Sequence, residues 1–174
     1  MSDVPAGDFD IRPARPDELP LLAEIEIDAF ATLAEALGVE RDAHALPQDV
    51  LRQSLREELL TVAIDDYDRP VAFLAGTEIE NTLYVIELDV SRRWQRRGVG
   101  RRLMLQAMAT ARSRRLAGAA LTTDRHVSFN ARFYRSLGFE LLEEGLPQFL
   151  RRKLREEIES GMDPDRRVAM ALWF

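Results

Sequence analysis

The residues best suited to chemistry lie in a turn that is rich in glycine and arginine. Residues 92–102 hold two glycines, Gly98 and Gly100, together with six arginines. Residues 84–90 before the turn alternate and predict a strand, and residues 99–111 after it carry apolar side chains at helical spacing. Such a strand–turn–helix unit is suited to binding phosphate, because the first helical turn offers unpaired N–H groups and a partial positive charge.

The spacing narrows the kind of phosphate site. No Gly-Lys-Ser/Thr follows the turn, which excludes a P-loop. The position three residues beyond Gly100 is Leu103, where a dinucleotide-binding fingerprint needs a third glycine. What remains is the pattern Gln-x-x-Gly-x-Gly over residues 95–100.

This pattern resembles the coenzyme A pyrophosphate loop of the GNAT superfamily of N-acetyltransferases. Leu88-Asp89-Val90 before the turn and Asn-Ala-Arg-Phe-Tyr-Arg-Ser-Leu-Gly-Phe at residues 130–139 are similar to the same family in the same order. The resemblance therefore spans residues 88–139. It implies an acyltransferase that moves an acetyl group from acetyl-CoA to a primary amine by direct attack in a ternary complex. No cysteine is present to carry the acyl group.

The resemblance also implies roles for particular residues. The freed backbone of the strand end holds the pantetheine arm, and main-chain N–H groups of the turn hold the pyrophosphate. Asn130 contacts the arm and Tyr134 protonates the leaving thiolate; the two are four residues apart and share one helical face. A tyrosine hydroxyl keeps its proton at neutral pH and can still donate it. The cofactor-binding residues implied are Leu88, Asp89, Val90, Gln95, Arg96, Arg97, Gly98, Val99, Gly100, Arg101, Asn130 and Tyr134.

The base that deprotonates the amine is open between Glu87, Asp89 and water. The two carboxylates alternate with apolar positions and share one face of the predicted strand. A partly buried carboxylate with a raised pKa can take an amine proton, directly or through water, and we place Glu87 first. His44 titrates in the right range but sits in a polar loop, and His126 is expected to serve local structure. No His, Asp or Glu group has metal-ligand spacing, so no metal is expected.

Composition limits the remaining classes of function. A chain of 174 residues is expected to form a single domain over residues 1–174, with residues 1–8 as a loose leader. The net charge of −6 argues against a nucleic-acid-binding protein. The arginines around the turn suit a compact, highly charged ligand such as coenzyme A. A non-catalytic acyl-CoA sensor of the same fold and an arginine-rich docking module without cofactor are the alternatives.

The location of the protein is predicted from what the chain lacks. No apolar run is long enough to span a bilayer, and no signal peptide is recognisable, so no membrane partner is expected. The lack of cysteine excludes disulfides and thiolate metal sites and fits a reducing cytoplasm. Lys153 is the lone lysine beside many arginines, which hints at a GC-rich bacterial genome.

The expected fold class is α/β (α+β), a mixed, mostly antiparallel twisted sheet of about six to seven strands, flanked by helices and split at the central strand. Three strands in meander order lead into the turn, and Ser128 is expected to cap the helix that carries Tyr134. Strands are expected at 9–12, 60–64, 71–79, 84–90, 119–123, 139–142 and 168–174, and helices at 16–38, 48–58, 99–115, 128–138 and 147–160.

Two regions are assigned less specific roles. The helix at 147–160 is an addition before the last strand, and a lid, a substrate wall and a contact in a homodimer are all open for it. The acceptor, a small-molecule or peptide amine, is expected to meet the first two helices and their connection. The acidic residues of that region are expected to form a solvated face. They are Glu24, Glu26, Asp28, Glu35, Glu40 and Asp42.

Overall fold

The computed structural model describes residues 8–38 and 44–174. Every predicted strand and helix is found, with bounds that differ by a few residues. The strands are β1 Asp10–Pro13, β2 Leu60–Ile64, β3 Pro70–Ile79, β4 Thr82–Val90, β5 Gly118–Asp124, β6 Glu140–Leu142 and β7 Arg167–Trp173. The helices are α1 Leu19–Leu37, α2 Gln48–Arg56, α3 Val99–Ser113, α4 Ser128–Ser136 and α5 Gln148–Glu159, with short 3₁₀ turns η1 Pro16–Glu18 and η2 Arg92–Trp94.

The strands form one sheet in the order β1-β2-β3-β4-β5-β7-β6. Its neighbours are antiparallel at β1/β2, β2/β3, β5/β7 and β6/β7. The β4/β5 pair is parallel and joins the starts of both strands, with Thr82 opposite Gly118 and Tyr84 opposite Ala120. The predicted mixed, mostly antiparallel sheet is therefore confirmed, as is the β2-β3-β4 meander that leads into the turn.

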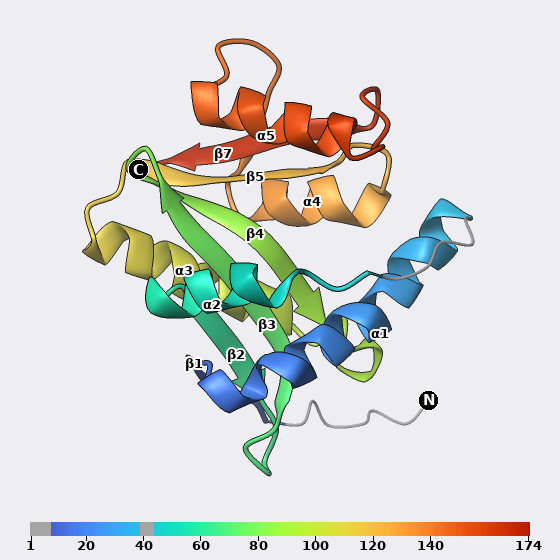
Figure 1. Ribbon diagram of the computed structural model, residues 1–174, viewed down its shortest axis with the longest axis vertical. Helices are drawn as coiled ribbons and strands as arrows, with labels where there is room; N and C mark the ends of the chain where they lie inside the picture. Colours follow the sequence, from blue (N-terminus) through green and yellow to red (C-terminus); the bar gives the residue numbers. More distant parts are fainter. Residues whose placement is uncertain (1–7, 39–43) are drawn as a thin grey trace. The chain divides into compact units, whose positions relative to one another are not determined.

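The chain divides into two compact units, and β4 contributes to both. The first unit holds the described residues up to Thr77 together with Ile86–Ala107. Its core forms where the apolar stripes of α1 and α2 pack on β2 and β3 (Figure 1). Leu22 and Leu51 from the helices and Phe73 from the sheet are fully buried there, which fixes α1 against the strands.

A charged corner ties the start of the first unit together. The guanidinium of Arg12 donates two hydrogen bonds to the carboxylate of Glu18, at 3.0 and 2.6 Å, and a third to Asp68 at 2.8 Å. The backbone N–H of Arg15 adds a bond of 2.8 Å to Glu18. Burial raises the pKa of Glu18, but these bonds outweigh burial and leave its pKa below the usual value.

The second unit comprises Glu78–Val85 and Met108–Phe174. Helices α4 and α5 lie on opposite sides of β5 and β7 (Figure 1). The carboxylate of Glu157 in α5 accepts hydrogen bonds from Thr122 of β5 and from Arg167 of β7. The extra helix is thus confirmed and fixed to the sheet. Its first half is buried through Phe149 and Leu150, whereas Ile158 near its end is 41% exposed.

The predicted capping of α4 by Ser128 is wrong. The helix begins at Ser128 itself, and Val127 occupies the capping position. The side chain of Asp124, at the end of β5, orders the loop before the helix, where it accepts hydrogen bonds from the backbone N–H groups of His126 and Val127 at 2.8 and 3.2 Å. In the described parts of the chain, no helix combines the length and hydropathy that a membrane crossing requires.

Candidate active site

The glycine turn connects β4 to α3 through two residues in the left-handed region of backbone space. Arg96 has a φ of 62° and Gly98 a φ of 81°. The N–H of Arg102 donates to the carbonyl of Gly98 at 3.1 Å, which starts the hydrogen-bonding of α3. Apart from Gly98 itself and its two neighbours in the chain, no heavy atom of the described residues lies within 4 Å of the position that a Cβ on Gly98 would take. The backbone here is therefore open to close approach by a ligand.

Gln95 fixes the turn from inside. Its Nε2 donates to the carbonyl of Val90 at the end of β4 at 2.9 Å, and its Oε1 accepts from the hydroxyl of Thr32 in α1 at 3.0 Å. The side chain is therefore engaged within the protein. A contribution of Gln95 to ligand binding would come from its backbone and from the shape that it gives the turn.

Helix α1 anchors the same turn through acidic side chains. The carboxylate of Asp28 accepts from the backbone N–H of Arg92 at 2.8 Å, and Glu35 pairs with the guanidinium of Arg92 at 2.9 Å. Asp28 and Glu35 remain exposed despite these contacts, so the prediction of a solvated face holds for both. It also holds for Glu24, which is exposed. The prediction is wrong for Glu26, which is partly buried. Glu40 and Asp42 lie outside the described residues.

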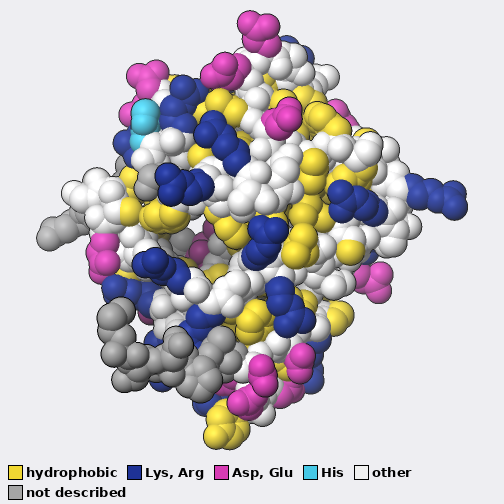
Figure 2. Space-filling view, turned by 180° about the vertical axis from the view of Figure 1, so that it is seen from behind, with side chains coloured by type: hydrophobic (Ala, Val, Ile, Leu, Met, Phe, Trp, Pro, Cys, Tyr) yellow, Lys and Arg dark blue, Asp and Glu magenta, His cyan; other side chains and the backbone are white. Residues whose placement is uncertain are grey.

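The arginines of the turn take different positions. The guanidinium of Arg97 lies 5.2 Å from the centre of the Trp94 ring, and that of Arg102 lies 4.9 Å from the ring of Phe9. Arg96 is exposed beside them. Basic side chains are also spread over the face seen in Figure 2, so they are not confined to this turn.

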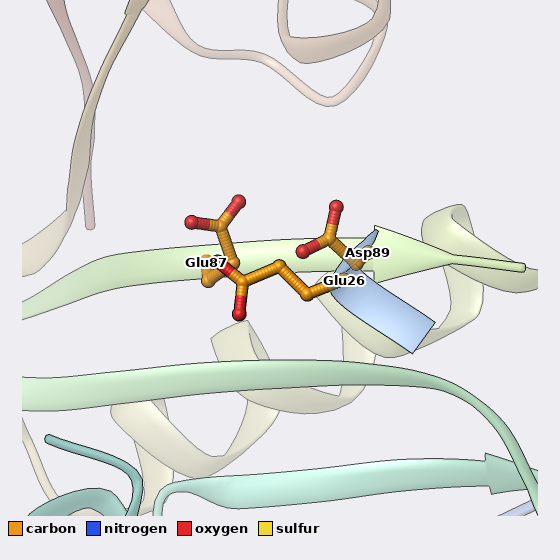
Figure 3. Close-up of side chains that lie close together, drawn as sticks. All are labelled: Glu26, Glu87 and Asp89. Carbon is orange, nitrogen blue, oxygen red and sulfur yellow. The ribbon is translucent and has the colours of Figure 1, made fainter. Parts of the chain in front are cut away.

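Three carboxylates meet beside β4. Glu87 and Asp89 rise from the same face of the strand, as predicted, and Glu26 reaches them from α1 (Figure 3). One oxygen from each of the three lies within 4.8 Å of the others. Sequence reasoning missed Glu26 because it is remote in the chain from the other two. Its spacing on α1, four residues after Leu22 and three before Ala29, was the available signal that it faces inward at least in part, because both are buried.

The cluster has unusual electrostatics. The pKa of Asp89 is raised well above its ordinary value, first by burial, then by the charges of Glu87 and Glu26 and by a hydrogen bond with Glu87. Its Oδ2 is buried and has no hydrogen-bond partner among the described residues. Burial also raises the pKa of Glu26, although the N–H of Leu46 donates to it at 2.8 Å and opposes the shift.

These three groups can hold a proton between them or bind a cation. Their arrangement is one that a metal ion could use. The prediction of no metal rested on spacing along the sequence, and that spacing does not reveal a group that folding assembles.

Tyr134 and Asn130 belong to α4 in the second unit, and both are half-buried. The ring of Tyr134 packs edge-on against Phe133 and Phe139, with centroids 5.1 and 6.0 Å apart. Leu88 and Val90 are half-buried in β4. The two histidines, His44 and His126, are exposed.

This fold and turn define an acyltransferase of the coenzyme A-dependent kind. Residues 21–139 match the family described as acetyltransferase (GNAT), and the chain belongs to this family. The expected superfamily and the expected acetyl-CoA-dependent acyltransferase class are thereby confirmed.

Solved structures share the fold at low sequence identity. The PaiA N-acetyltransferase of Thermoplasma acidophilum, in complex with coenzyme A, superposes with a TM-score of 0.71 at 16% identity over 96% of this chain and 99% of that one. The ribosomal-protein-S18-alanine N-acetyltransferase of Escherichia coli gives 0.68 at 18%, over 95% and 94%. The N-acetylglutamate synthase of Neisseria gonorrhoeae, complexed with coenzyme A and N-acetyl-glutamate, gives 0.69 at 17%, over 96% and 35%.

Proposed function

We propose that this protein transfers an acetyl group from acetyl-CoA to a primary amine by direct attack in a ternary complex. The observation that carries the proposal is the turn between β4 and α3, where Gly98 leaves the backbone open beside the first turn of a helix. Fold neighbours crystallised with coenzyme A support it. The amine acceptor is a small molecule or a peptide, and the reaction takes place in the cytoplasm without nucleic acid or membrane.

The residues of the first unit fit this co-substrate. The backbone of Leu88, Asp89 and Val90 lines the pantetheine arm, and main-chain N–H groups of residues 95–101 hold the pyrophosphate. The anchors from Thr32 and Asp28 keep the turn in shape before the ligand arrives, so less ordering is needed on binding. Asn130 completes the contacts to the arm in this proposal.

In the proposed reaction, each proton transfer is assigned to one residue. The amine nitrogen attacks the thioester carbonyl, a C–N bond forms and the C–S bond breaks. Glu87 accepts the proton that the amine loses, and Tyr134 donates a proton to the departing thiolate. Asp89, whose pKa is raised, forms a hydrogen bond with Glu87 that would hold the Glu87 carboxylate in place.

Calorimetric titration with acetyl-CoA tests the proposal. The unsubstituted protein is expected to bind acetyl-CoA, and Gly98→Trp is expected to abolish binding. The indole ring would occupy the space beside the turn, and position 98 needs a positive φ that tryptophan rarely adopts. Gly100→Trp serves as a second variant of the same turn. Thiol release with a panel of amines then measures turnover. No binding to the unsubstituted protein would refute the proposal, and binding without turnover on any amine would favour an acyl-CoA sensor.

A further inference from the structure

Helix α5 carries three arginines whose charges have no partner in the described part of the chain. Arg151, Arg152 and Arg155 are exposed, and none of their side chains forms a hydrogen bond or an ion pair with a described residue. Together with Gln148 they line a hollow of about 400 Å³, the arginine hollow. These four positions follow the helical repeat, so they share one face of α5.

This arrangement is unfavourable for the helix itself. Arg155 lies four residues after Arg151 and three after Arg152, so its charge repels both. Arg151 and Arg152 come directly after the first turn. Helical side chains point back toward the N-terminus, whose partial positive charge opposes cations. The first turn of α5, which is fully described, contains no acidic residue to offset them. An anion bound at this face would relieve these repulsions.

Two acids of α5 are engaged with other cations. Glu156 pairs with Lys153 at 3.2 Å, and Glu157 accepts a hydrogen bond from Arg167 of β7 at 3.0 Å. Glu156 lies four residues after Arg152, which is the spacing of a helical ion pair, yet its charge is used by Lys153. The helix therefore does not complete the charge group that its arginines begin.

The arginine hollow is distinct from the residues proposed for acetyl-CoA. None of the described residues that line it belongs to the glycine turn or to α4. Within the second unit, α4 and α5 lie on opposite sides of β5 and β7 (Figure 1). An occupant of the hollow is therefore a second ligand, and its binding does not depend on the proposed acetyl transfer.

The lining defines the chemistry of this ligand. Small-molecule sites have volumes of about 300–1,000 Å³, and the arginine hollow falls in this range. Its described lining residues are all polar, so the ligand is recognised through charged groups. Guanidinium groups bind phosphate through pairs of parallel N–H···O bonds. Residues 151 and 155 are about 6 Å apart along the helix axis, so linked phosphates can meet the guanidinium groups in turn.

We propose that Arg151, Arg152 and Arg155 bind a small molecule that carries a chain of two or more linked phosphates. Two phosphate groups carry about three to four negative charges, which matches the three arginines. Gln148 adds an amide N–H donor at the same face. An inorganic oligophosphate and a nucleotide both present such a chain.

Calorimetric titration of the full chain with sodium triphosphate tests the proposal, at low salt so that exposed charges are not screened. We expect binding, both with and without coenzyme A. Arg151→Gln/Arg155→Gln should raise Kd by at least about tenfold, the effect of losing charged hydrogen bonds. The matched control is Arg52→Gln/Arg56→Gln, which removes two exposed arginines at the same spacing from α2 and should leave Kd unchanged.

A second pair of substitutions separates the shape of the guanidinium from its charge. Arg151→Lys/Arg155→Lys keeps both charges and loses the paired N–H groups, so its Kd should lie between those of the unsubstituted protein and the glutamine pair. Circular dichroism checks that each variant is folded. If the glutamine pair does not fold, the lysine pair carries the test, and an unchanged Kd in it would overturn the proposal.

Other outcomes would also overturn the proposal. The first is no binding of triphosphate, and the second is an equal rise of Kd in the α2 control, which would indicate general attraction to surface arginines. The third is competition by coenzyme A together with loss of binding in Gly98→Trp, which would place triphosphate at the glycine turn. The fourth is binding of citrate as tight as that of triphosphate, since citrate has three carboxylates and no phosphate.

Titration with ATP distinguishes the two sources of the phosphate chain. Equal Kd values for ATP and triphosphate would support recognition of the phosphates alone and thus an inorganic oligophosphate. A tighter Kd for ATP, lost to the same extent in Arg151→Gln/Arg155→Gln, would support a nucleotide at the same arginines. Binding of ATP that this pair of substitutions leaves unchanged would contradict the proposed site.

Discussion

Two groups of carboxylates in the first unit differ in how their charge is balanced. At the charged corner, Arg12 and Arg15 surround Glu18 and Asp68, and the pKa values of both acids lie below their ordinary values. In the cluster beside β4, the pKa values of Asp89 and Glu26 are raised, above all by burial.

The contrast separates carboxylates that serve the fold from carboxylates that are candidates for a role in function. The corner is made by residues close in the sequence, Arg12 to Glu18, plus Asp68 from the turn before β3. It is complete within the chain. The cluster is made by two elements, α1 and β4, and neither brings a basic side chain that lowers the pKa of Glu26 or Asp89. Burial of Asp89 and Glu26 raises their pKa values and costs stability, and such a cost is typical of functional sites.

The largest expected effect is on kcat, which should depend on the cluster beside β4 and not on the charged corner. Glu87→Gln should lower kcat by about 10²–10⁴-fold, the range for loss of a general base, with little change in acetyl-CoA affinity. Glu18→Gln should leave kcat unchanged, because the corner acts on the fold. Thiol-release kinetics and calorimetry on both variants measure this difference. A Glu87→Gln enzyme with unchanged kcat would move the role of base to Asp89 or water.

The next effect is on stability at the corner. Arg12→Met should lower the free energy of unfolding by about 1–3 kcal/mol, because Glu18 loses its charged partner while its side chain is only 10% exposed. The control is Arg52→Met, which breaks the exposed pair with Asp49 and should change stability by less than about 1 kcal/mol. Urea unfolding followed by circular dichroism measures both. Equal losses in the two variants would mean that the corner contributes no more than a surface pair.

The pH dependence of the corner has a definite sign. The pKa of Glu18 is lower in the folded protein than its ordinary value of 4.5. Its contribution to stability is therefore fully present above that pH and is lost as the pH falls through the folded pKa. The loss caused by Arg12→Met should shrink in acid for the same reason.

The smallest expected effect is an increase in the free energy of unfolding. Asp89→Asn should stabilise the protein at neutral pH, because it removes a carboxyl group whose ionised form is penalised by burial in the folded state. The unfolded carboxyl titrates near 3.8 and the folded one higher. Wild-type stability therefore falls as the pH rises between these values, and the difference from Asp89→Asn vanishes below the lower one. Urea unfolding from acid to neutral pH measures this. A difference that grows in acid would contradict the raised pKa.

Much of the fold could be predicted from local patterns. Alternation and helical spacing gave the strands and helices, since each buries one face, and the spacing of Gln95, Gly98 and Gly100 gave the turn. The family match extends over residues 21–139 and confirms what these few residues indicated.

The candidate site was only half predictable. Glu87 and Asp89 were found because neighbours two apart on a strand share a face. Glu26 was not, because its partners lie some sixty residues away and acids on a helix are usually solvated. Asp28 and Glu35 are exposed, as expected, but their contacts with the turn were not foreseen for the same reason. Burial and long-range pairing decide the role of a charged residue, and neither can be read from its immediate neighbours.

Helix α1 contacts both groups of residues that the proposed reaction uses. Within three turns it presents Glu26 to the cluster beside β4, and Asp28, Thr32 and Glu35 to the glycine turn. Preference for a new acceptor would thus have to evolve through a helix that also sets the shape of the coenzyme turn. Among the described residues, Glu26 forms no hydrogen bond or ion pair with the turn and can be substituted without changing the shape of the turn. Asp28 and Thr32 are constrained, because they form hydrogen bonds with the turn. Exchanging α1 between relatives would transfer acceptor preference only when the turn is exchanged with it.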